Sequence, residues 1–330
     1  MNKTIKNILL FSFTAVLLWF SLKNLELSKL KEAWQETNFF LLTLTSFIAI
    51  FSHVIRAERW KLMLTPLGHK VSLKNSFYAV MIGYFVNLAI PRGGELSRCV
   101  SLKKSDNVPL EQSLGTVLAE RIIDLVFMLL LIGVTLLIEF KKIMTIMYDV
   151  YGGLQEKIAS ISLAFVLIFL FSFIFFLAIL FYLYKKGTFD RLFQKVKGFL
   201  IGLKEGIFSL FKLRKISLFM LHSIVIWVSY YFMTYYGMKA FPSVAHLGAS
   251  PALTIFVAGG IAMIIPLPGG TGSYHTIIPT VLLLYAISPT DGASFATIFH
   301  LWQTLTIILV GSICLLLGQV KSKSTGLESA

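Results

Sequence analysis

Two carboxylates and an arginine lie close together inside an otherwise apolar stretch of the chain, 115–138. Glu120 and Asp124 are four residues apart, so on a helix their side chains share one face, and Arg121 is the adjacent cation. Ionisable residues at membrane depth are costly and normally face the bundle interior or a water-filled cavity. The three residues therefore indicate either a site for a polar lipid headgroup or a structural ion-pair cluster, which Arg92 or Arg98 would complete.

A proline–glycine turn precedes this stretch and carries charged residues of its own. In Ile90-Pro91-Arg92-Gly93-Gly94-Glu95 the proline removes a backbone donor and the glycines remove side chains, so a helix must break here. If the next helix starts near Gly94, its free N–H groups could face an anion. A fork of arginines, Arg92 and Arg98, suits phosphate better than lysine would. The alternative is that both arginines anchor this helix at the cytoplasmic surface.

The second half of the chain contains a similar turn, Ile265-Pro266-Leu267-Pro268-Gly269-Gly270-Thr271-Gly272. Irregular backbone survives at membrane depth only inside protein or along a polar cavity, and paired interruptions in two halves point to a transporter-type binding site. His275 follows this turn and His300 lies in the last apolar stretch, where they either contact substrate or form hydrogen-bonded helix contacts. Neither spacing fixes a metal site, so no metal and no cofactor is predicted.

The composition is typical of a protein embedded in a membrane. Of 330 residues, 56% are hydrophobic and 14% charged, whereas a soluble domain carries roughly a quarter charged residues. We expect an all-α polytopic membrane protein with about six full spans and two re-entrant helical hairpins, at 76–104 and 251–287, because the hairpin arms are near or below the length that crosses a bilayer. The full spans are expected at 5–22, 39–56, 115–138, 158–184, 216–238 and 293–318.

Lysine and arginine are concentrated in the segments that face the cytoplasm if the N-terminus does, which predicts two cytoplasmic termini in the cytoplasmic membrane. In this orientation the two hairpins and their following spans run in opposite directions, as in inverted-topology repeats. The chain would form one transmembrane domain, 1–320, with a short tail, 321–330. Its net charge of +14 is explained by this topology and does not predict a nucleic-acid partner.

Two further basic segments each have two interpretations. Apolar residues recur at helical spacing over 189–211, with basic residues on the other face, which predicts an interfacial helix on anionic lipid headgroups. The alternative is a topology determinant alone. Arg56, Glu58, Arg59 and Trp60 end the second expected span, where arginines and tryptophan mainly anchor a helix at the interface. Direct headgroup contact is the alternative there.

These clusters resemble the lysylphosphatidylglycerol synthase transmembrane-region family, also called the flippase-like domain family. The resemblance extends from the first span to Gly318 and is carried by 56–60, 91–98, 120–124 and 266–272. It implies lipid translocation in members fused to an aminoacyl-lipid synthase, and leaves the function of many stand-alone members open. Many relatives end the last motif with an acidic residue where this chain has His275. The sequence carries no aminoacyl-transferase domain, so aminoacyl transfer to lipid is not expected.

The leading hypothesis is a translocator of a lipid or lipid-linked anion without enzymatic activity, because no phosphate-loop, Ser/His/Asp or His-Glu-x-x-His arrangement is present. A membrane enzyme acting on a lipid-linked substrate and an accessory subunit of a lipid or glycan synthesis partner are the alternatives. A homo-oligomer and a complex with a synthase both remain open. The candidate substrate-binding residues are Arg92, Glu95, Arg98, Glu120, Arg121, Asp124, His275 and His300, and the turn residues are Pro91, Gly93, Gly94, Pro266, Pro268, Gly269, Gly270 and Gly272.

These candidates are expected to divide by charge. Arg92, Arg98 and Arg121 would balance a phosphate, whereas Glu120 and Asp124 would bind an amine or relay protons. Because an arginine alone in hydrocarbon costs about 2.5–3.5 kcal/mol on insertion scales, Arg121 must have an anionic partner. That partner is expected to be a carboxylate or a phosphate, and Glu120 and Asp124 are the carboxylates nearest to it in the sequence.

Overall fold

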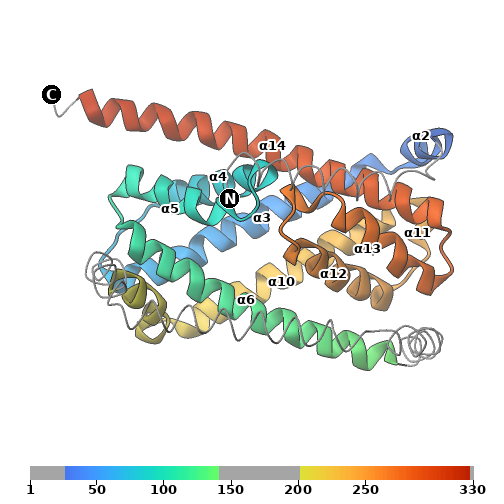
Figure 1. Ribbon diagram of the computed structural model, residues 1–330, viewed down its shortest axis with the longest axis horizontal. Helices are drawn as coiled ribbons and strands as arrows, with labels where there is room; N and C mark the ends of the chain where they lie inside the picture. The colour runs from blue at the N-terminus through green and yellow to red at the C-terminus, as the bar shows by residue number, and fades with distance from the viewer. Residues whose placement is uncertain (1–26, 141–200, 328–330) are drawn as a thin grey trace, which may run out of the picture.

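The computed structural model describes residues 27–140 and 201–327, and in these residues it is helical and contains no strand (Figure 1). Within these residues, four helices are long and apolar enough to cross a membrane: Phe39–Leu67, Leu110–Ile138, Ile216–Lys239 and Pro289–Gly318. The expectation of an all-α, multi-pass membrane protein is therefore confirmed. The predicted spans at 5–22 and 158–184 lie outside the described residues, as does most of 189–211.

The long helices are joined by shorter helices and tight turns. The elements are α2 (Leu27–Glu36), α3 (Phe39–Leu64), η1 (Thr65–Leu67), α4 (Leu73–Ala89), α5 (Gly93–Asp106), α6 (Leu110–Ile138), η2 (Ser209–Lys212), α10 (Ile216–Lys239), α11 (Pro242–Ala245), α12 (Ala249–Ile264), η3 (Pro268–Gly270), α13 (Ser273–Leu282), η4 (Leu283–Tyr285) and α14 (Pro289–Leu327). Asn38 caps α3 by accepting a hydrogen bond from the Leu41 amide at 3.2 Å. The helix then continues beyond its predicted end at residue 56 as far as Leu64.

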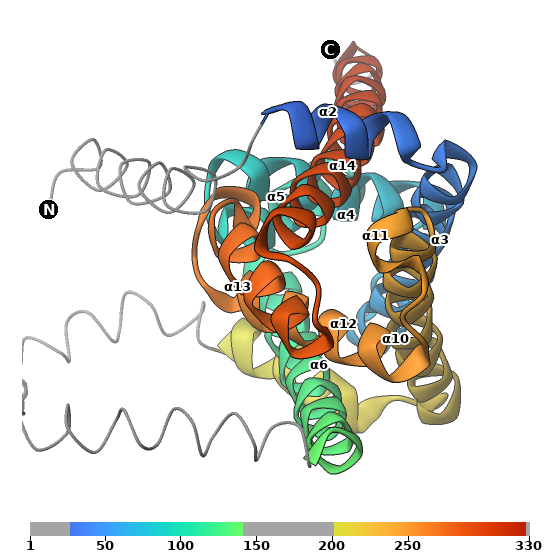
Figure 2. The ribbon, with the colours of Figure 1, turned by 90° about the vertical axis from the view of Figure 1, so that its right-hand side faces the viewer.

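The helices form one bundle in which α6 and α14 lie on opposite sides (Figures 1 and 2). α3 packs against α10, α5 packs against α6, and α14 contacts α4, α5 and α13. One apolar cluster, around Trp60, Val80 and Leu102, lies beside α4 and α5, and another, around Phe295 and Ile278, lies beside α12 and α13. Each hairpin therefore has its own packed surroundings.

Two helix–turn–helix pairs, α4–α5 and α12–α13, coincide with the segments predicted as re-entrant hairpins. In the first, Arg92 adopts a left-handed φ of 60° between the two helices. The arms approach closely because Gly94 lacks a side chain, since a Cβ there would meet the carbonyl of Gly83 and the side chain of Asn87. In the second, three glycines of the turn have positive φ, a conformation that residues with a side chain rarely adopt: Gly269 (57°), Gly270 (72°) and Gly272 (95°).

The two turns meet. The hairpins occupy opposite halves of the long axis of the molecule (Figure 1), and Arg92 Nη2 of the first donates to the Ile264 carbonyl of the second at 3.2 Å. Gly269 packs against Leu88, whose Cδ2 would lie 3.1 Å from a Cβ at the glycine. The residues that the sequence pairs by their similarity are thus also neighbours in space.

Candidate functional site

A buried ion-pair cluster joins α3, α5 and α6. Arg56 Nη1 lies 2.6 Å from Glu120 Oε1 and 3.0 Å from Asp124 Oδ2. Arg59 Nη2 lies 2.9 Å from Glu120 Oε1 and 2.8 Å from Asp124 Oδ1. Arg98 pairs with the other oxygen of Glu120. We call these five residues the arginine cluster; its side chains are at most 10% exposed.

Helix periodicity explains why the arginine cluster forms. Arg56 and Arg59 are three residues apart on α3, and Glu120 and Asp124 are four apart on α6, so each pair shares a face. Because each arginine of α3 bonds both carboxylates, the two helices are joined by four ion pairs. The sequence left open whether Glu120 and Asp124 form a headgroup site or a structural ion-pair cluster, and the geometry shows that both are ion-paired, with Arg98 as one of the partners.

Polar and aromatic neighbours complete the arginine cluster. Tyr230 of α10 accepts from Arg56 at 3.2 Å, and Ser223 accepts from Arg59 at 2.9 Å. The Arg98 guanidinium lies over the Trp60 ring, 4.2 Å from its centroid. Trp60 itself donates to Thr116 of α6 at 2.9 Å. These contacts therefore join four helices, α3, α5, α6 and α10, at one place in the bundle.

Arg121 has a carboxylate partner, as expected, but this partner is neither Glu120 nor Asp124, the carboxylates nearest to it in the sequence. One residue along a helix is a rotation of about 100°, which turns Arg121 away from α3 and toward α5. Its Nη2 lies 3.3 Å from Glu95 Oε1, and the two side chains are 45% and 29% exposed. The other carboxylates are already held by Arg56, Arg59 and Arg98. Arg121 and Glu95 thus form a separate, partly exposed pair beside the arginine cluster.

The start of α5 offers fewer free donors than expected. The Gly94 amide donates to Asn87 Oδ1 at 2.7 Å, and the Gly93 amide donates to the Ile90 carbonyl at 2.9 Å. Arg92 is exposed, and its Nη2 donates to the Ile264 carbonyl at the end of α12. The helix terminus is therefore partly capped by the hairpin itself.

The two histidines hold the second turn. His300 Nε2 lies 3.0 Å from the Gly269 carbonyl, so this nitrogen carries the proton that it donates. The Gly272 amide lies 3.4 Å from His275 Nδ1, which accepts. The two rings lie 5.0 Å apart, and His300 stacks on Tyr274. The hydrogen-bonded helix contacts that are one of their two interpretations are present, and substrate contact by these histidines stays a prediction. In the described residues no group of three His, Cys, Asp or Glu side chains could hold a metal ion.

Sequence reasoning missed the role of Arg56 and Arg59. They were expected mainly to anchor a helix at the membrane interface, but they are 3% and 0% exposed within the bundle and pair with Glu120 and Asp124. A signal was present in the matched spacing of two arginines and two carboxylates. It was not decisive, because the spacing does not reveal which helices face each other. Asn87, Ser223 and Tyr230 carry no motif that would single them out.

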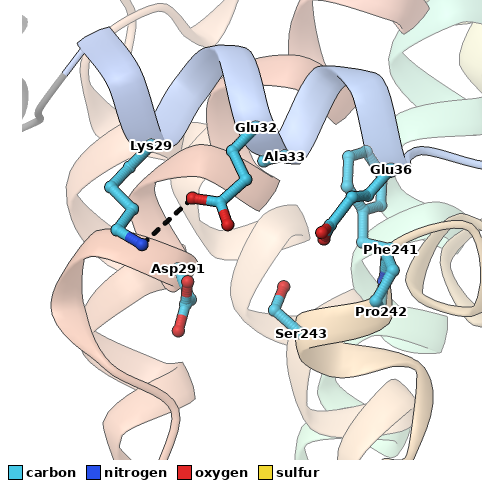
Figure 3. A pocket seen from close by; sticks show the side chains of 8 residues that line it. All are labelled: Lys29, Glu32, Ala33, Glu36, Phe241, Pro242, Ser243 and Asp291. Carbon is cyan, nitrogen blue, oxygen red and sulfur yellow. Dashed lines mark hydrogen bonds and ion pairs between the residues drawn. The ribbon is translucent and has the colours of Figure 1, made fainter.

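Two hollows lie away from these residues. One, of about 90 Å³, opens between α2, α11 and the start of α14, where Lys29 Nζ lies 3.0 Å from Glu32 Oε2 (Figure 3). The other, of about 320 Å³, is an apolar groove between α3 and α10, lined by Ile48, Phe51, Val228, Ser229, Phe232 and Tyr236. Neither contains a predicted site residue.

The fold and the site define a polytopic α-helical membrane protein with an ionic core. It has spanning helices, two broken hairpins whose turns touch, and a buried arginine cluster. The chain belongs to the lysylphosphatidylglycerol synthase TM region family, whose model matches residues 7–311. A UPF0104 membrane protein of Methanocaldococcus jannaschii is 33% identical over 122 residues, which cover 35% of this chain and 36% of that protein. No solved structure matches the chain.

Proposed function

We propose that this protein translocates a lipid or a lipid-linked anion across the cytoplasmic membrane. The observation that carries the proposal is the pair of Arg121 and Glu95, since Arg121 is 45% exposed although it belongs to a spanning helix. Charged side chains at this depth normally face a water-filled cavity or a substrate path. A lipid headgroup is the polar substrate that such a position meets.

The hairpins support this function as re-entrant elements. Their arms have 17, 14, 16 and 10 residues, whereas about 20 residues are needed to cross the hydrocarbon core. Entry of the hairpins from opposite sides would bring their turns together at mid-depth, as in inverted-repeat transporters. A headgroup would pass beside the turns while its acyl chains stay in the lipid.

The charged residues then have distinct roles. The arginine cluster holds α3, α5 and α6 in position and is too enclosed to receive a headgroup. Arg121 binds the anionic group, and Glu95 is its counter-ion in the empty protein. Glu120 and Asp124, each held by two or more arginines, leave no free carboxylate oxygen for an amine. The absence of enzymatic activity stays a prediction.

Transport should be measured with the purified protein in vesicles that contain a lipid labelled in the headgroup. We expect label to cross the bilayer without chemical change, and Arg121→Gln to reduce the rate at least tenfold through loss of a charge-assisted contact. Arg214→Gln, the same change at an exposed residue outside the spans, should leave it unchanged. A chemically new lipid would indicate an enzyme instead. Activity that appears only with a synthase would indicate an accessory subunit.

Re-entry should be measured separately by cysteine labelling. In a background with Cys99 and Cys314 replaced by alanine, Arg92→Cys and Thr271→Cys should each react with a small water-soluble thiol reagent, from opposite sides of the membrane. Both native cysteines are buried, so the background signal should be small. A turn that is labelled from neither side would contradict a polar path between the hairpins.

A further inference from the structure

The four arginines of this region are held in two different ways. Arg56, Arg59 and Arg98 are at most 5% exposed and belong to the arginine cluster. Arg121 has one ion-pair contact, at 3.3 Å, and is 45% exposed. Because a partly exposed pair of this length contributes little to stability, its partner can be exchanged, whereas the partners of the other three cannot.

The carboxylate of Glu95 is correspondingly poorly held. Its Oε1 contacts Arg121, while its Oε2 is buried and has no hydrogen-bond partner among the residues that the structure describes. A carboxylate oxygen buried without a donor is unfavourable. Glu95 lies in the first turn of α5, where a carboxylate that leaves Arg121 is still favoured by the helix dipole. The Glu95 side chain is therefore weakly held in its present position, and the N-terminus of α5 still stabilises its charge after it leaves Arg121.

The ion-paired groups do not balance. Within residues 27–140 and 201–327, the ion pairs join four guanidinium groups, of Arg56, Arg59, Arg98 and Arg121, to three carboxylates, of Glu95, Glu120 and Asp124. One positive charge is left over among them. The Nε donors of Arg56, Arg59 and Arg98 are buried without an acceptor, which agrees with a shortage of anions. An unbalanced charge at membrane depth is costly. One added negative charge would remove it.

We propose that Glu95 occupies the place of the substrate on Arg121, and that a singly charged phosphodiester lipid displaces it during binding. This inference rests on the proposed function and specifies the substrate class of that site. The two free oxygens of a phosphodiester match the planar fork of the guanidinium. A phosphomonoester carries a charge of about −1.5 to −2 at neutral pH, and would replace a positive excess by a negative one. Selectivity then follows from charge balance.

The test is the binding of short-chain lipids to the detergent-solubilised protein, measured by native mass spectrometry. Dihexanoyl phosphatidylglycerol should bind more tightly than dihexanoyl phosphatidic acid. Glu95→Gln removes the competitor and adds one net positive charge, so it should tighten phosphatidylglycerol binding about two- to fivefold, the range for a partly exposed ion pair, and shift the preference toward phosphatidic acid. Glu36→Gln, at an exposed position on α2, should change neither quantity.

A second variant separates competition from charge. Glu95→Asp keeps the carboxylate but shortens its reach to Arg121, so binding should tighten without a shift in preference. Weaker or unchanged binding in both Glu95 variants would overturn the proposal, as would equal binding of glycerophosphoglycerol, the same headgroup without acyl chains. If both binding predictions hold but vesicles show no transport, the proposed function fails and the placeholder role of Glu95 stands. If transport occurs but Glu95→Gln leaves the preference unchanged, the proposed function stands and the placeholder role of Glu95 fails.

Discussion

The two hairpins have the same kind of backbone break but are fastened by different chemistry. The first, α4–α5, carries Arg92, Glu95 and Arg98, and its second arm is tied to α6 by ion pairs. The turn of the second, α12–α13, is held by neutral contacts of His275 and His300, and its charged contact, from Arg92 to the Ile264 carbonyl, comes from the first hairpin. Only the first hairpin therefore offers charged groups to an anion. Under the proposed function, the first hairpin would therefore bind the anion and the second would maintain the shape of its turn.

The largest loss of stability is expected from Glu120→Gln, which removes the central carboxylate of the arginine cluster. Glu120 is fully buried and meets Arg56, Arg59 and Arg98. Breaking a buried ion pair on one side costs about 3–5 kcal/mol, because charges remain unpaired. We expect a large fall in the midpoint of thermal unfolding in detergent. The double variant Glu120→Gln/Arg98→Gln should be less destabilised than the sum of its two single variants. Strict additivity would show that the groups do not act together.

A smaller effect is expected from Gly94→Ala, which tests the close approach inside the first hairpin. The new Cβ would meet the Gly83 carbonyl and the Asn87 side chain, and such overpacking typically costs about 1–3 kcal/mol. Gly133→Ala is the matched control, because a Cβ at this residue of α6 meets nothing within 4 Å. It should raise stability slightly through helix propensity. Equal unfolding midpoints for the two variants would contradict the close packing of α4 on α5.

The helices and both breaks could be predicted because they depend on local sequence. Long apolar runs and proline–glycine clusters act within a few residues, so the hairpins expected at 76–104 and 251–287 agree closely with α4–α5 and α12–α13. The end of α3 was placed too early because Arg56 and Arg59 resemble an interfacial anchor. A buried arginine is stable at this place only because the carboxylates of α6 face it. These carboxylates lie more than sixty residues away in the chain.

The ion-pair partner of Arg121 could not be predicted either, because it also depends on contacts between residues that are distant in the sequence. Proximity in sequence favoured Glu120 or Asp124 as the partner of Arg121, but the rotation of α6 is set by its packing against α3 and α5. Once Arg56, Arg59 and Arg98 occupy Glu120 and Asp124, Glu95 is the carboxylate left to Arg121. This pairing depends on tertiary packing, and no local sequence pattern encodes it. The roles of His275 and His300 were open because a histidine next to a broken helix fits both substrate contact and a turn hydrogen bond.

The smallest effect is expected from His300→Phe, which keeps a ring that can stack on Tyr274 but removes the donor to the Gly269 carbonyl. The loss of one neutral buried hydrogen bond should lower stability by about 1 kcal/mol. It should leave the preference for a phosphodiester over a phosphomonoester lipid unchanged, since the second hairpin contributes no charge. Glu95→Gln should do the opposite, with a shifted preference and little change in the unfolding midpoint. Both quantities can be measured on the same preparations. If His300→Phe shifted the preference as far as Glu95→Gln does, the second hairpin would take part in binding the anion, and the division between a binding half and a shape-keeping half would fail.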